Sequence, residues 1–459
     1  MTLEIVILAA GKGSRMKSDL PKVLHTLAGK SLLEHVLSAA AKLKPARIHI
    51  VIGHRSEQVK AAIDPDRIDA GINWVVQQQQ LGTGHAVAQA LPDIDPQSTV
   101  LIMAGDVPLI QPSTLRPLCQ LETGINLLTA ELSDPSGLGR IIRQGENASV
   151  SAIVEHKDAS EAQRTIKEIN TGVMAARATD LNDWLARVKN HNAQNEYYLP
   201  DIIALAVSDG KTVNACMTND AVQVTGINSR IELALLERLY QKRFAHQLMQ
   251  EGVGLADPDR IDIRGILKTG EDCFIDINCI FEQTVKLGNR VHIGPNVMII
   301  NSEIADDCRI EANSVIDNAV IAQRCNIGPF ARIRPDTMLL AGSRIGNFVE
   351  IKKSTIGKDS KVNHLSYVGD SLVGERVNIG AGVITCNYDG AYKHQTIIGD
   401  DVFVGSDCQL IAPVEIGSGA TIGAGSTIRK NAPQDKLTLT NSKQLSVKGW
   451  RRPRKPSAK

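Results

Sequence analysis

The sequence predicts an α/β doubly wound domain over residues 1–228, a helical linker over 229–251, and a parallel β-helix of hexapeptide repeats over 252–459. Three observations support this division. Strand-like and helix-like segments alternate in the first half. A single segment with helical spacing of apolar residues fills the middle, and an aliphatic residue recurs every six positions in the second half. A chain of 459 residues is also too long for a single compact core.

The first half alternates short β-branched segments with helical ones, which is typical of a mostly parallel sheet covered by helices. Ligands of such folds bind beyond the carboxyl ends of the strands. The predicted strands are Leu3–Ala9, Ile48–Gly53, Trp74–Gln77 and Val100–Ala104, and the predicted first helix carries Leu33, Val36, Leu37, Ala40 and Leu43 at helical spacing.

The middle segment, from Ser229 to about Glu251, is predicted to form one amphipathic helix. At 1.5 Å per residue it would be about 30 Å long, which is enough to hold two domains apart. The residues predicted to form its apolar side are Ile231, Leu235, Leu236, Leu239 and Phe244.

The second half has a period of six, which no helix can use, because successive apolar residues would point in different directions. A three-sided coil of short strands can use it, with about 18 residues in each coil. The in-register positions are Ile321, Ile327, Ile333, Leu339, Ile345 and Ile351, and later Ile398, Val404, Leu410, Ile416, Ile422 and Ile428. Two interruptions, at 362–372 and 385–396, are predicted to be loops on one face.

Composition and cysteine spacing exclude several classes of protein. Lys and Arg total 51 and Asp and Glu total 50, so the net charge gives no support for a nucleic-acid partner. No segment approaches the 18 or so apolar residues of a membrane helix, and the apolar N-terminus is too short and too acidic for a signal peptide. The eight cysteines form no C-x-x-C pair and no zinc spacing, which indicates reduced thiols in a cytoplasmic protein. Cys308, Cys325 and Cys408 occupy the small position of a hexad and are predicted to be buried.

A glycine-rich segment, Leu8-Ala9-Ala10-Gly11-Lys12-Gly13-Ser14-Arg15-Met16, follows the first predicted strand, and Pro21-Lys22 comes soon after it. Its glycines let backbone N–H groups approach phosphate oxygens, and Arg15 and Lys22 would neutralise phosphate charge. The dinucleotide and Walker patterns are not met, because position 16 is Met and position 6 is Val. A plain strand–helix connection is the alternative, and the two basic side chains favour a phosphate site.

This segment resembles the signature of the sugar-1-phosphate nucleotidylyltransferases. The further matches are Gln77 with Leu81-Gly82-Thr83-Gly84-His85, Gly105-Asp106-Val107-Pro108-Leu109, Gly139-Arg140-Ile141, Val154-Glu155-His156-Lys157, Asn170-Thr171-Gly172 and Gly226-Ile227-Asn228. Together with the hexads, the resemblance covers nearly the whole chain and extends to a bacterial bifunctional family. Those enzymes acetylate glucosamine-1-phosphate and couple the product to UTP, which makes UDP-N-acetylglucosamine for peptidoglycan and lipopolysaccharide.

The resemblance implies a nucleotidyltransferase site in the first domain. Asp106 and Asn228 would hold Mg²⁺, and Lys22 and Arg15 would carry the chemistry, which is in-line attack of a sugar phosphate on the α-phosphorus of UTP. Gln77, Gly82 and Thr83 would contact uracil, and Gly139, Glu155 and Asn170 the sugar. The complete implied set is Leu8, Ala9, Ala10, Gly11, Lys22, Gln77, Gly82, Thr83, Ala104, Gly105, Asp106, Gly139, Glu155, Asn170 and Asn228.

The second half carries candidates for acetyl transfer. Arg334 and Lys352 are 18 residues apart, so they are expected to stack on neighbouring coils, where an anion would relieve their repulsion. His364 is expected nearby as the base that deprotonates the amine. The resemblance implies that Arg334 and Lys352 hold the phosphate of glucosamine-1-phosphate, with Tyr367 and Asn378 on its sugar. The implied acetyl-CoA contacts are Ala381, Asn387, Tyr388, Ser406, Ala424 and Asn441.

One position departs from the family pattern: Asn441 stands where relatives commonly carry Arg. Lys443 or the basic tail that begins at Arg451 would be the substitutes for a CoA phosphate contact, unless that tail is only a solvated end. The resemblance further implies a left-handed coil and a homotrimer. Two alternatives are a nucleotidylyltransferase whose β-helix only assembles subunits, and a non-catalytic regulatory module. His364 argues against the first, and Lys22, Asp106 and Asn228 together argue against the second.

Overall fold

The computed structural model describes residues 2–11, 13–121, 123–144, 149–440 and 443–452. The chain divides into two compact units, Met1–Tyr240 and Gln241–Lys459. The division falls inside helix α8 (Arg230–Gln250), which is the helix predicted for the middle segment.

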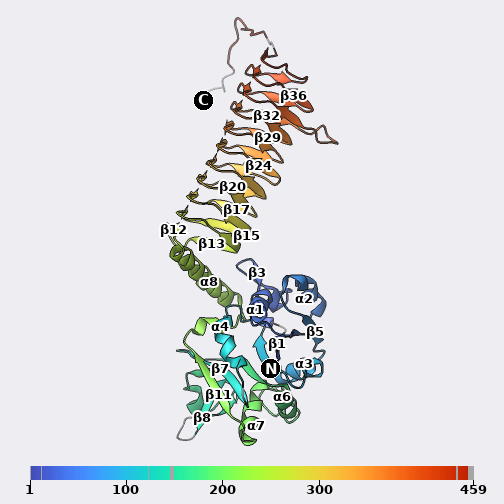
Figure 1. Cartoon of the computed structure of the whole chain (residues 1–459), viewed down its shortest axis with the longest axis vertical. Helices are drawn as coiled ribbons and strands as arrows, with labels where there is room; N and C mark the ends of the chain where they lie inside the picture. Colours follow the sequence, from blue (N-terminus) through green and yellow to red (C-terminus); the bar gives the residue numbers. More distant parts are fainter. Residues whose placement is uncertain (1, 12, 122, 145–148, 441–442, 453–459) are drawn as a thin grey trace, which may run out of the picture. The chain divides into compact units, whose positions relative to one another are not determined.

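The N-terminal unit contains a nine-stranded sheet whose central path is β11-β7-β10-β6-β1-β4-β5 (Figure 1). β1 lies between β4 and β6 and is parallel to both, whereas β10 is antiparallel to its neighbours β6 and β7. The strands of this unit are β1 (Leu3–Ala9), β2 (Thr26–Leu27), β3 (Lys30–Ser31), β4 (Arg47–Ile52), β5 (Ile72–Val76), β6 (Thr99–Ala104), β7 (Ile125–Glu131), β8 (Arg140–Gln144), β9 (Ser149–Val154), β10 (Glu168–Arg177) and β11 (Val213–Thr218). The four predicted strands are confirmed as β1, β4, β5 and β6.

Helices cover both faces of this sheet, as a doubly wound fold requires. Ile5 and Ile7 of β1 pack in one core with α1, whereas Val6 packs in a second core with α3 on the opposite face. The helix α1 begins at a capping box formed by Ser31 and Glu34. The helices are α1 (Leu32–Ala41), α2 (Ser56–Ala62), α3 (Thr83–Ala90), α4 (Pro112–Leu115), α5 (Glu161–Arg164), α6 (Ala178–Leu185) and α7 (Ile202–Ser208). The short 3-10 helices are η1 (Ser14–Met16), η2 (Lys22–Leu24), η3 (Pro65–Arg67), η4 (Leu91–Asp93), η5 (Arg116–Cys119), η6 (Leu199–Asp201) and η7 (Ala221–Val224).

The apolar side predicted for α8 is wrong. Ile231, Leu235 and Leu239 are 74%, 59% and 40% exposed, and only Leu236 of the predicted set is buried, while Phe244 is partly buried. The reason is that each half of the helix packs on a different core. Leu236 belongs to a core of the N-terminal unit, and Phe244 packs against the core of the C-terminal unit. No single stripe therefore has to be apolar along its whole length.

The C-terminal unit is a parallel β-helix of stacked three-sided coils (Figure 1). We number the faces in chain order. Face 1 consists of β12 (Gly254–Leu255), β14 (Phe274–Ile275), β16 (His292–Ile293), β19 (Arg309–Ile310), β22 (Asn326–Ile327), β25 (Arg344–Asn347), β28 (Lys361–His364), β31 (Asn378–Ile379), β34 (Phe403–Val404), β37 (Thr421–Ile422) and β39 (Leu437–Thr438). Face 2 consists of β17 (Met298–Ile300), β20 (Val315–Asp317), β23 (Arg332–Ile333), β26 (Glu350–Lys352), β29 (Tyr367–Gly369), β32 (Ile384–Cys386), β35 (Gln409–Ile411) and β38 (Thr427–Ile428). Face 3 consists of β18 (Glu303–Ile304), β21 (Ala319–Ile321), β24 (Thr337–Leu339), β27 (Thr355–Ile356), β30 (Ser371–Val373), β33 (Thr396–Ile398) and β36 (Val414–Ile416). The long strands β13 (Ile261–Lys268) and β15 (Cys279–Leu287) begin in line with face 2 and run on into face 3.

The hexad prediction is confirmed, because all twelve in-register aliphatic residues are buried in the core of the coil. The predicted loop at 362–372 is wrong, because this segment forms β28, β29 and β30. One side of the coil is a residue shorter, so Ile345 pairs with Val362 and Ile351 with Val368 at a spacing of 17. The six-residue pattern in the sequence is therefore displaced by one position, although the strands continue to stack. The second interruption does leave the coil, between β32 and β33.

The cysteines are all free, and Cys308, Cys325 and Cys408 are buried as predicted. Burial raises the pKa of Cys119 and Cys279 to about 11, which makes these thiols unreactive. Among the described residues, no helix has both the length and the apolar character to cross a membrane.

Candidate functional site

A cavity of about 520 Å³ opens in the N-terminal unit at the carboxyl ends of β1 and β6. In doubly wound sheets this is where the crossovers diverge and ligands bind. Ten of the residues predicted to contact the UDP-sugar line it. The lining residues are Leu8, Ala9, Ala10, Gly11, Gly13, Ser14, Lys22, Val23, Gln77, Gln80, Gly82, Thr83, Ala86, Ala104, Asp106 and Glu196.

The described residues of the glycine-rich segment begin at the end of β1, and those from Leu8 to Gly11 line the cavity with Gly13 and Ser14. Gly13 has a positive φ of 60°, and a Cβ there would lie 2.6 Å from Cβ of Lys22, so only glycine lets the segment pass this close. Gly11 is exposed, with no atom near the position of an added Cβ. Arg15 is exposed on η1 and does not line the cavity. Of the two predicted catalytic cations, the structure brings only Lys22 to the cavity wall.

Lys22 joins the two predicted metal ligands. Its ammonium forms a short ion pair with Asp106 and donates a hydrogen bond to Oδ1 of Asn228 at 3.0 Å. Asp106 follows β6, and backbone N–H of Ile227 donates to its carbonyl at 3.0 Å, which brings Asn228 close. A carboxylate and an amide oxygen therefore converge on one cation. Hard oxygen ligands of this kind suit a divalent metal, so the donor set fits the predicted ion.

Gln77 and Gly82 shape the side of the cavity predicted to contact uracil. Gln77 is 3% exposed, and its amide nitrogen donates to the Gly82 carbonyl at 3.2 Å and lies 2.9 Å from Nδ1 of His85. Its Oε1 accepts no hydrogen bond from the described residues. Gly82 has φ +112°, and a Cβ there would lie 2.6 Å from the Tyr197 carbonyl oxygen. Thr83 accepts a hydrogen bond from N–H of Leu199 at 3.0 Å, which anchors the start of α3.

The three predicted sugar ligands lie together. N–H of Asn170 donates to the Gly139 carbonyl at 2.9 Å, and a Cβ on Gly139 would lie 3.1 Å from Oε1 of Glu155. Burial raises the pKa of Glu155, and the nearby carboxylates of Asp158 and Asp201 raise it further. A carboxylate with a raised pKa at this position can accept a hydrogen bond from a sugar hydroxyl when it is ionised.

Sequence reasoning missed Gln80 and Glu196, which also line the cavity. Glu196 comes from a segment more than 110 residues after Thr83. This segment is fixed there by a hydrogen bond from N–H of Tyr197 to the Leu81 carbonyl, at 2.8 Å. No pattern in the sequence around Glu196 predicts this long-range contact, so the sequence alone could not place Glu196 in the cavity.

In the C-terminal unit, Arg334 and Lys352 lie side by side, because β23 and β26 pair with Ile333 opposite Ile351. The predicted stacking is confirmed. Each cation also has an acidic neighbour that was not predicted. Nη1 of Arg334 lies 2.6 Å from Glu350, and Nζ of Lys352 lies 3.7 Å from Asp370. When no anion is bound between Arg334 and Lys352, these carboxylates hold the two mutually repelling cations in place.

The edge between faces 2 and 3 gathers further polar groups; we call it the second edge, formed by Arg334, Lys352, Asp370 and Asn387. The amide of Asn387 donates to Asp370 and, at 3.4 Å, to the hydroxyl of Tyr367. Lys393, which was not predicted, returns from the insertion toward Lys352, whose ammonium lowers the pKa of Lys393. Tyr388 of the same insertion is 60% exposed.

The other predicted residues lie on the edge between faces 1 and 2, the first edge, formed by Asn347, His364, Ala381, Ser406 and Ala424. His364 pairs in register with Asn347, whose Oδ1 lies 2.8 Å from its Nδ1. Successive backbone hydrogen bonds carry the ladder from His364 past Ala381 and Ser406 to Ala424. Asn378 starts β31 on face 1. The expectation that His364 neighbours Lys352 is therefore wrong, because 12 residues are only two of the three sides of a coil, and the residue opposite Lys352 is Gly369.

The acetyl-transfer candidates thus form two groups on different edges of one chain, separated by the width of face 2. Asn441 lies outside the described residues, and so does the tail beyond Arg452. Arg451 and Arg452 are exposed.

Comparison with known proteins agrees with both halves. Family models match three stretches: MobA-like NTP transferase domain at 5–138, GMPPB C-terminal domain at 263–342, and bacterial transferase hexapeptide (six repeats) at 395–430. Three relatives, each named bifunctional protein GlmU, match over nearly the whole chain. The protein of Marinobacter nauticus is 52% identical over 455 residues, covering 99% of this chain and 99% of its own length. The protein of Pseudoalteromonas atlantica is 50% identical over 99% of this chain and 100% of its own, and that of Alkalilimnicola ehrlichii is 51% identical over 98% and 96%. With half of its residues identical over the full length of these relatives, the chain belongs to the family of bifunctional GlmU proteins.

Proposed function

We propose that each unit of this bifunctional enzyme carries one of its two activities. The β-helix acetylates glucosamine-1-phosphate with acetyl-CoA, and the N-terminal cavity transfers uridylyl from UTP to the N-acetylglucosamine-1-phosphate formed, releasing pyrophosphate. The product, UDP-N-acetylglucosamine, supplies peptidoglycan and lipopolysaccharide synthesis. The observation that carries the assignment of the first site is the ammonium of Lys22 held between oxygens of Asp106 and Asn228 in the cavity beside β1.

In uridylyl transfer the protein positions the two substrates and neutralises charge, and no protein nucleophile is needed. The backbone of 8–11 and the ammonium of Lys22 would hold the phosphates of UTP, while Gln77, through its free Oε1, accepts from N3–H of uracil. Glu155 and Asn170 hold the acceptor sugar so that its phosphate oxygen lies in line with the α-phosphorus. Arg15, on an exposed short helix, would reach the phosphates only by turning inward.

Mg²⁺ is part of this proposal, with Asp106 and Asn228 as its protein ligands. When bound, the ion supplies additional positive charge to the triphosphate and to the pyrophosphate that leaves. Lys22 would then give up its contact with Asp106 and turn to a phosphate oxygen. The short Lys22–Asp106 pair supports this, because it holds a cation at the place that the two oxygens define.

For acetyl transfer, the acceptor phosphate would bind at the second edge, where Arg334, Lys352 and Lys393 converge. Tyr367 and Asn378 would position the sugar, and Asn387 would contact acetyl-CoA. His364 would take the proton from the 2-ammonium so that the nitrogen can attack the thioester carbonyl; the C–S bond then breaks and CoA leaves as the thiol. Asn347, which lies 2.8 Å from Nδ1, would orient the imidazole with Nε2 toward the amine. Ala381, Ser406 and Ala424 would form the ledge along which CoA lies, with Tyr388 over it.

These two groups would meet in a homotrimer, where the first edge of one copy faces the second edge of the next. Exposed apolar side chains support such contacts. The rings of Phe330 and Phe348 stack with their centroids 5.2 Å apart, beside Leu365 on the first edge. The three side chains are 50%, 56% and 63% exposed. Face 3 carries exposed apolar side chains in one register column, Val320 and Met338 before Thr355, and Leu372 and Ile397 after it. A cytoplasmic location completes the proposal, supported by the scattered free thiols.

Two variants that remove a positive charge test the assignment. Lys22→Met should abolish pyrophosphate release from UTP and N-acetylglucosamine-1-phosphate, and leave thiol release from acetyl-CoA and glucosamine-1-phosphate unchanged. Arg334→Gln should do the reverse. Loss of both activities in either folded variant would contradict the assignment of one activity to each unit.

A further inference from the structure

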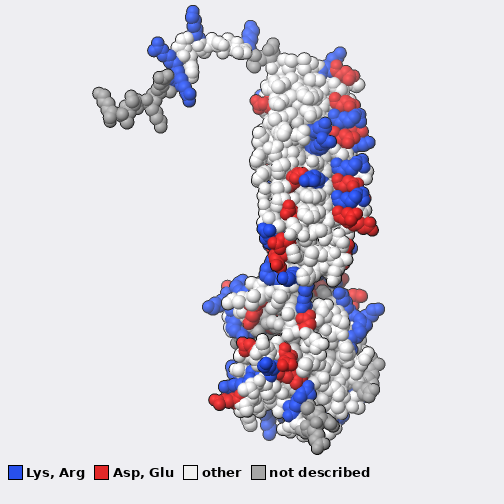
Figure 2. All heavy atoms as spheres, turned by 90° about the vertical axis from the view of Figure 1, so that its left-hand side faces the viewer, with Lys and Arg blue, Asp and Glu red and all other residues white. Residues whose placement is uncertain are grey.

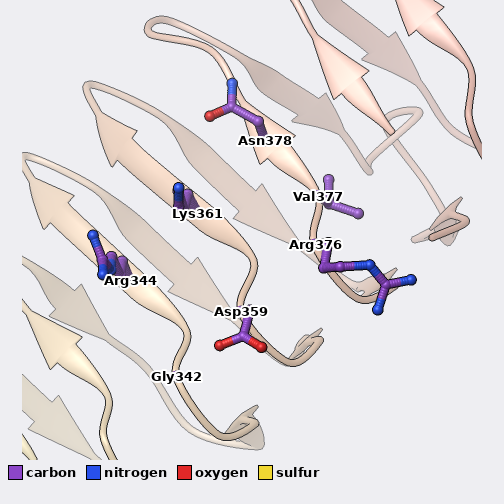
Figure 3. Close-up of a pocket in the computed structure, with 7 residues that line it drawn as sticks. All are labelled: Gly342, Arg344, Asp359, Lys361, Arg376, Val377 and Asn378. Atoms are coloured by element: carbon purple, nitrogen blue, oxygen red, sulfur yellow. The ribbon is translucent and has the colours of Figure 1, made fainter. Parts of the chain in front are cut away.

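A second cavity, of about 350 Å³, lies on face 1 of the β-helix and belongs to neither proposed site except through Asn378 (Figure 3). Arg344, Lys361 and Asn378 begin three successive strands and stand in one row. The register places Arg344 opposite Lys361 and Lys361 opposite Asn378. All three side chains can donate hydrogen bonds from one side of the sheet.

The two cations of this row have no counter-ion. Among the described residues, neither Arg344 nor Lys361 forms an ion pair, although they are direct neighbours on parallel strands, where like charges repel. Arg309 provides a contrast, since it stands in the same outward column two coils earlier and lies 2.6 Å from Glu311. The uncompensated pair is therefore a local feature of the coils that contain Arg344 and Lys361.

The adjoining third edge, between faces 3 and 1, explains why there is a hollow here. On this edge, one residue per coil has a positive φ, and acidic and basic side chains alternate at these positions except at Gly342. The residues are Asp272, Arg290, Asp307, Arg324, Gly342, Asp359, Arg376 and Asp401. Alternating basic and acidic side chains run along one edge of the coils in Figure 2. Arg290 pairs with Asp307 at 2.7 Å, and Arg376 with Asp401 at 2.7 Å. Between Asp272 and Asp401, Gly342 is the one member of this series without a side chain; the next member after Asp401 is again a glycine, Gly419.

The gap at Gly342 has a defined cause. A Cβ at this residue would lie 2.2 Å from Oδ1 of Asp359, so any other residue would displace that carboxylate. The hollow is floored by Gly342 and walled by Arg344, Lys361 and Asn378 on one side and by Asp359 and Arg376 on the other (Figure 3). Arg376 is already paired with Asp401 and Glu375, so the other charged lining residues, Arg344, Lys361 and Asp359, leave one net positive charge in the hollow.

We propose that the hollow formed by Arg344, Lys361 and Asn378 binds a phosphomonoester dianion. A guanidinium fork, an ammonium and an amide on one row are all donors, and the fork matches phosphate oxygens in geometry. A dianion between Arg344 and Lys361 would also relieve their repulsion. Asp359 opposes the anion, so it sets the affinity low enough for release.

The proposed function supplies two sources of this group, and only the identity of the source rests on it. One is the phosphate of glucosamine-1-phosphate, and the other is the 3′-phosphate of CoA. Lys361 and His364 are on the same strand, β28, so a phosphate held on Lys361 would lie close to the proposed base. The hollow would thus capture an anionic substrate beside the acetyl-transfer site.

Binding of labelled inorganic phosphate to the full-length chain tests the proposal. The background is the Arg334→Gln, Lys352→Gln variant, which removes the other proposed phosphate site of the β-helix. Adding Arg344→Gln and Lys361→Gln should weaken one phosphate site per chain by at least about tenfold. Asp359→Asn should strengthen the same site, because it removes the opposing charge. Arg309→Gln, on the same face, is the matched control and should change nothing.

Three further titrations of the otherwise wild-type chain identify the source, with and without Arg344→Gln and Lys361→Gln. Weaker binding of glucosamine-1-phosphate in the variant identifies the sugar phosphate. Weaker binding of CoA, with dephospho-CoA unaffected, identifies the 3′-phosphate. Unchanged phosphate binding in a folded variant, or an equal loss with Arg309→Gln, would overturn the proposal. Because binding is measured without turnover, this result is independent of whether the β-helix transfers acetyl groups.

Discussion

The nucleotide cavity and the acetyl-transfer residues differ in how much of a site one chain provides. In the N-terminal unit, segments more than 200 residues apart meet within hydrogen-bond distance, as Lys22 and Asn228 do. In the β-helix, His364 and Lys352 are only 12 residues apart and still lie on different edges. Nearness in sequence is therefore a poor guide to nearness in space in the second region.

The difference follows from the two architectures. A doubly wound sheet directs the carboxyl ends of its parallel strands toward one edge, so residues that follow different strands converge there. A solenoid places each residue beside those one coil away and sends successive sides in diverging directions. Residues spaced 17 or 18 apart line up along one edge of the coil. Two different edges can come together only when a second copy of the chain is added. This is why we propose that the N-terminal site is complete in one chain and that the second is assembled from two.

The greatest loss of activity is expected from a substitution in the N-terminal unit. Asp106→Ala should reduce uridylyl transfer by at least about 10³-fold, because it removes the carboxylate that pairs with Lys22 and that would hold the proposed metal ion. Pyrophosphate release measures it. Acetyl transfer should be unchanged, since no residue of the β-helix is altered. If both activities fell together in a folded protein, the two sites would not be separate.

His364→Ala is expected to have the next largest effect, on acetyl transfer alone. The amine of glucosamine is protonated near neutral pH, and a positioned base contributes about 10²–10⁴-fold. We therefore expect thiol release to fall at least about 10²-fold, with little change in binding of the sugar phosphate. Asn347→Ala, which leaves the imidazole in place but unoriented, should cause a smaller loss. Near-normal acetylation by His364→Ala would assign the base to another group.

Glu155→Gln should alter the pH dependence of uridylyl transfer. Burial and the nearby acidic residues raise the pKa of Glu155, so in the wild type the KM for N-acetylglucosamine-1-phosphate should increase as pH falls through that raised pKa. The amide variant should have a KM about tenfold higher near neutral pH and lack this acidic limb. KM measured against pH decides the matter. An acidic limb that persists in Glu155→Gln must come from another group.

Gly82→Ala should have the smallest effect. With φ +112° and the Tyr197 carbonyl 2.6 Å from the new methyl, the substitution should cost about 1–3 kcal/mol of stability and raise the KM for UTP several-fold. Thermal unfolding and UTP titration measure the two effects. Gly210→Ala is the matched control, because its φ is also positive while its surroundings are open. Equal destabilisation in both variants would show that backbone strain, rather than the crowding at Tyr197, causes the loss.

Much of the fold could be predicted from the sequence, because both regions have a strong local pattern. The strand β1 and the twelve in-register aliphatic residues follow directly from β-branched segments and from a period of six. The loop predicted at 362–372 was wrong for a physical reason. A side shortened by one residue shifts the sequence phase, yet backbone pairing tolerates a coil of 17 as well as one of 18.

The sites were less predictable where contacts depend on side-chain direction or on distant segments. Lys22, Asp106 and Asn228 were identified through the family motifs, and the structure joins them. Glu196 and Lys393 carry no motif. Glu196 reaches its site from a segment fixed by a long-range contact, and Lys393 from an insertion whose strand-like bridge joins Tyr388 to Lys393. Arg15 matches the motif but points to the exterior. Residue spacing alone also suggested that His364 neighbours Lys352, and the register excludes this.

Subunit mixing tests most directly the claim that one site is complete in a chain and the other is shared. His364→Ala alters the first edge and Lys352→Gln the second, so each protein alone should be inactive in acetyl transfer. Co-assembled at equal amounts, they should regain about a quarter of wild-type activity, because random mixing pairs two intact edges at that frequency in a ring of copies. A matched mixture of Lys22→Met with Asp106→Ala should regain no uridylyl transfer. Absence of recovery in the first mixture after demonstrated co-assembly, or recovery in the second, would contradict the account.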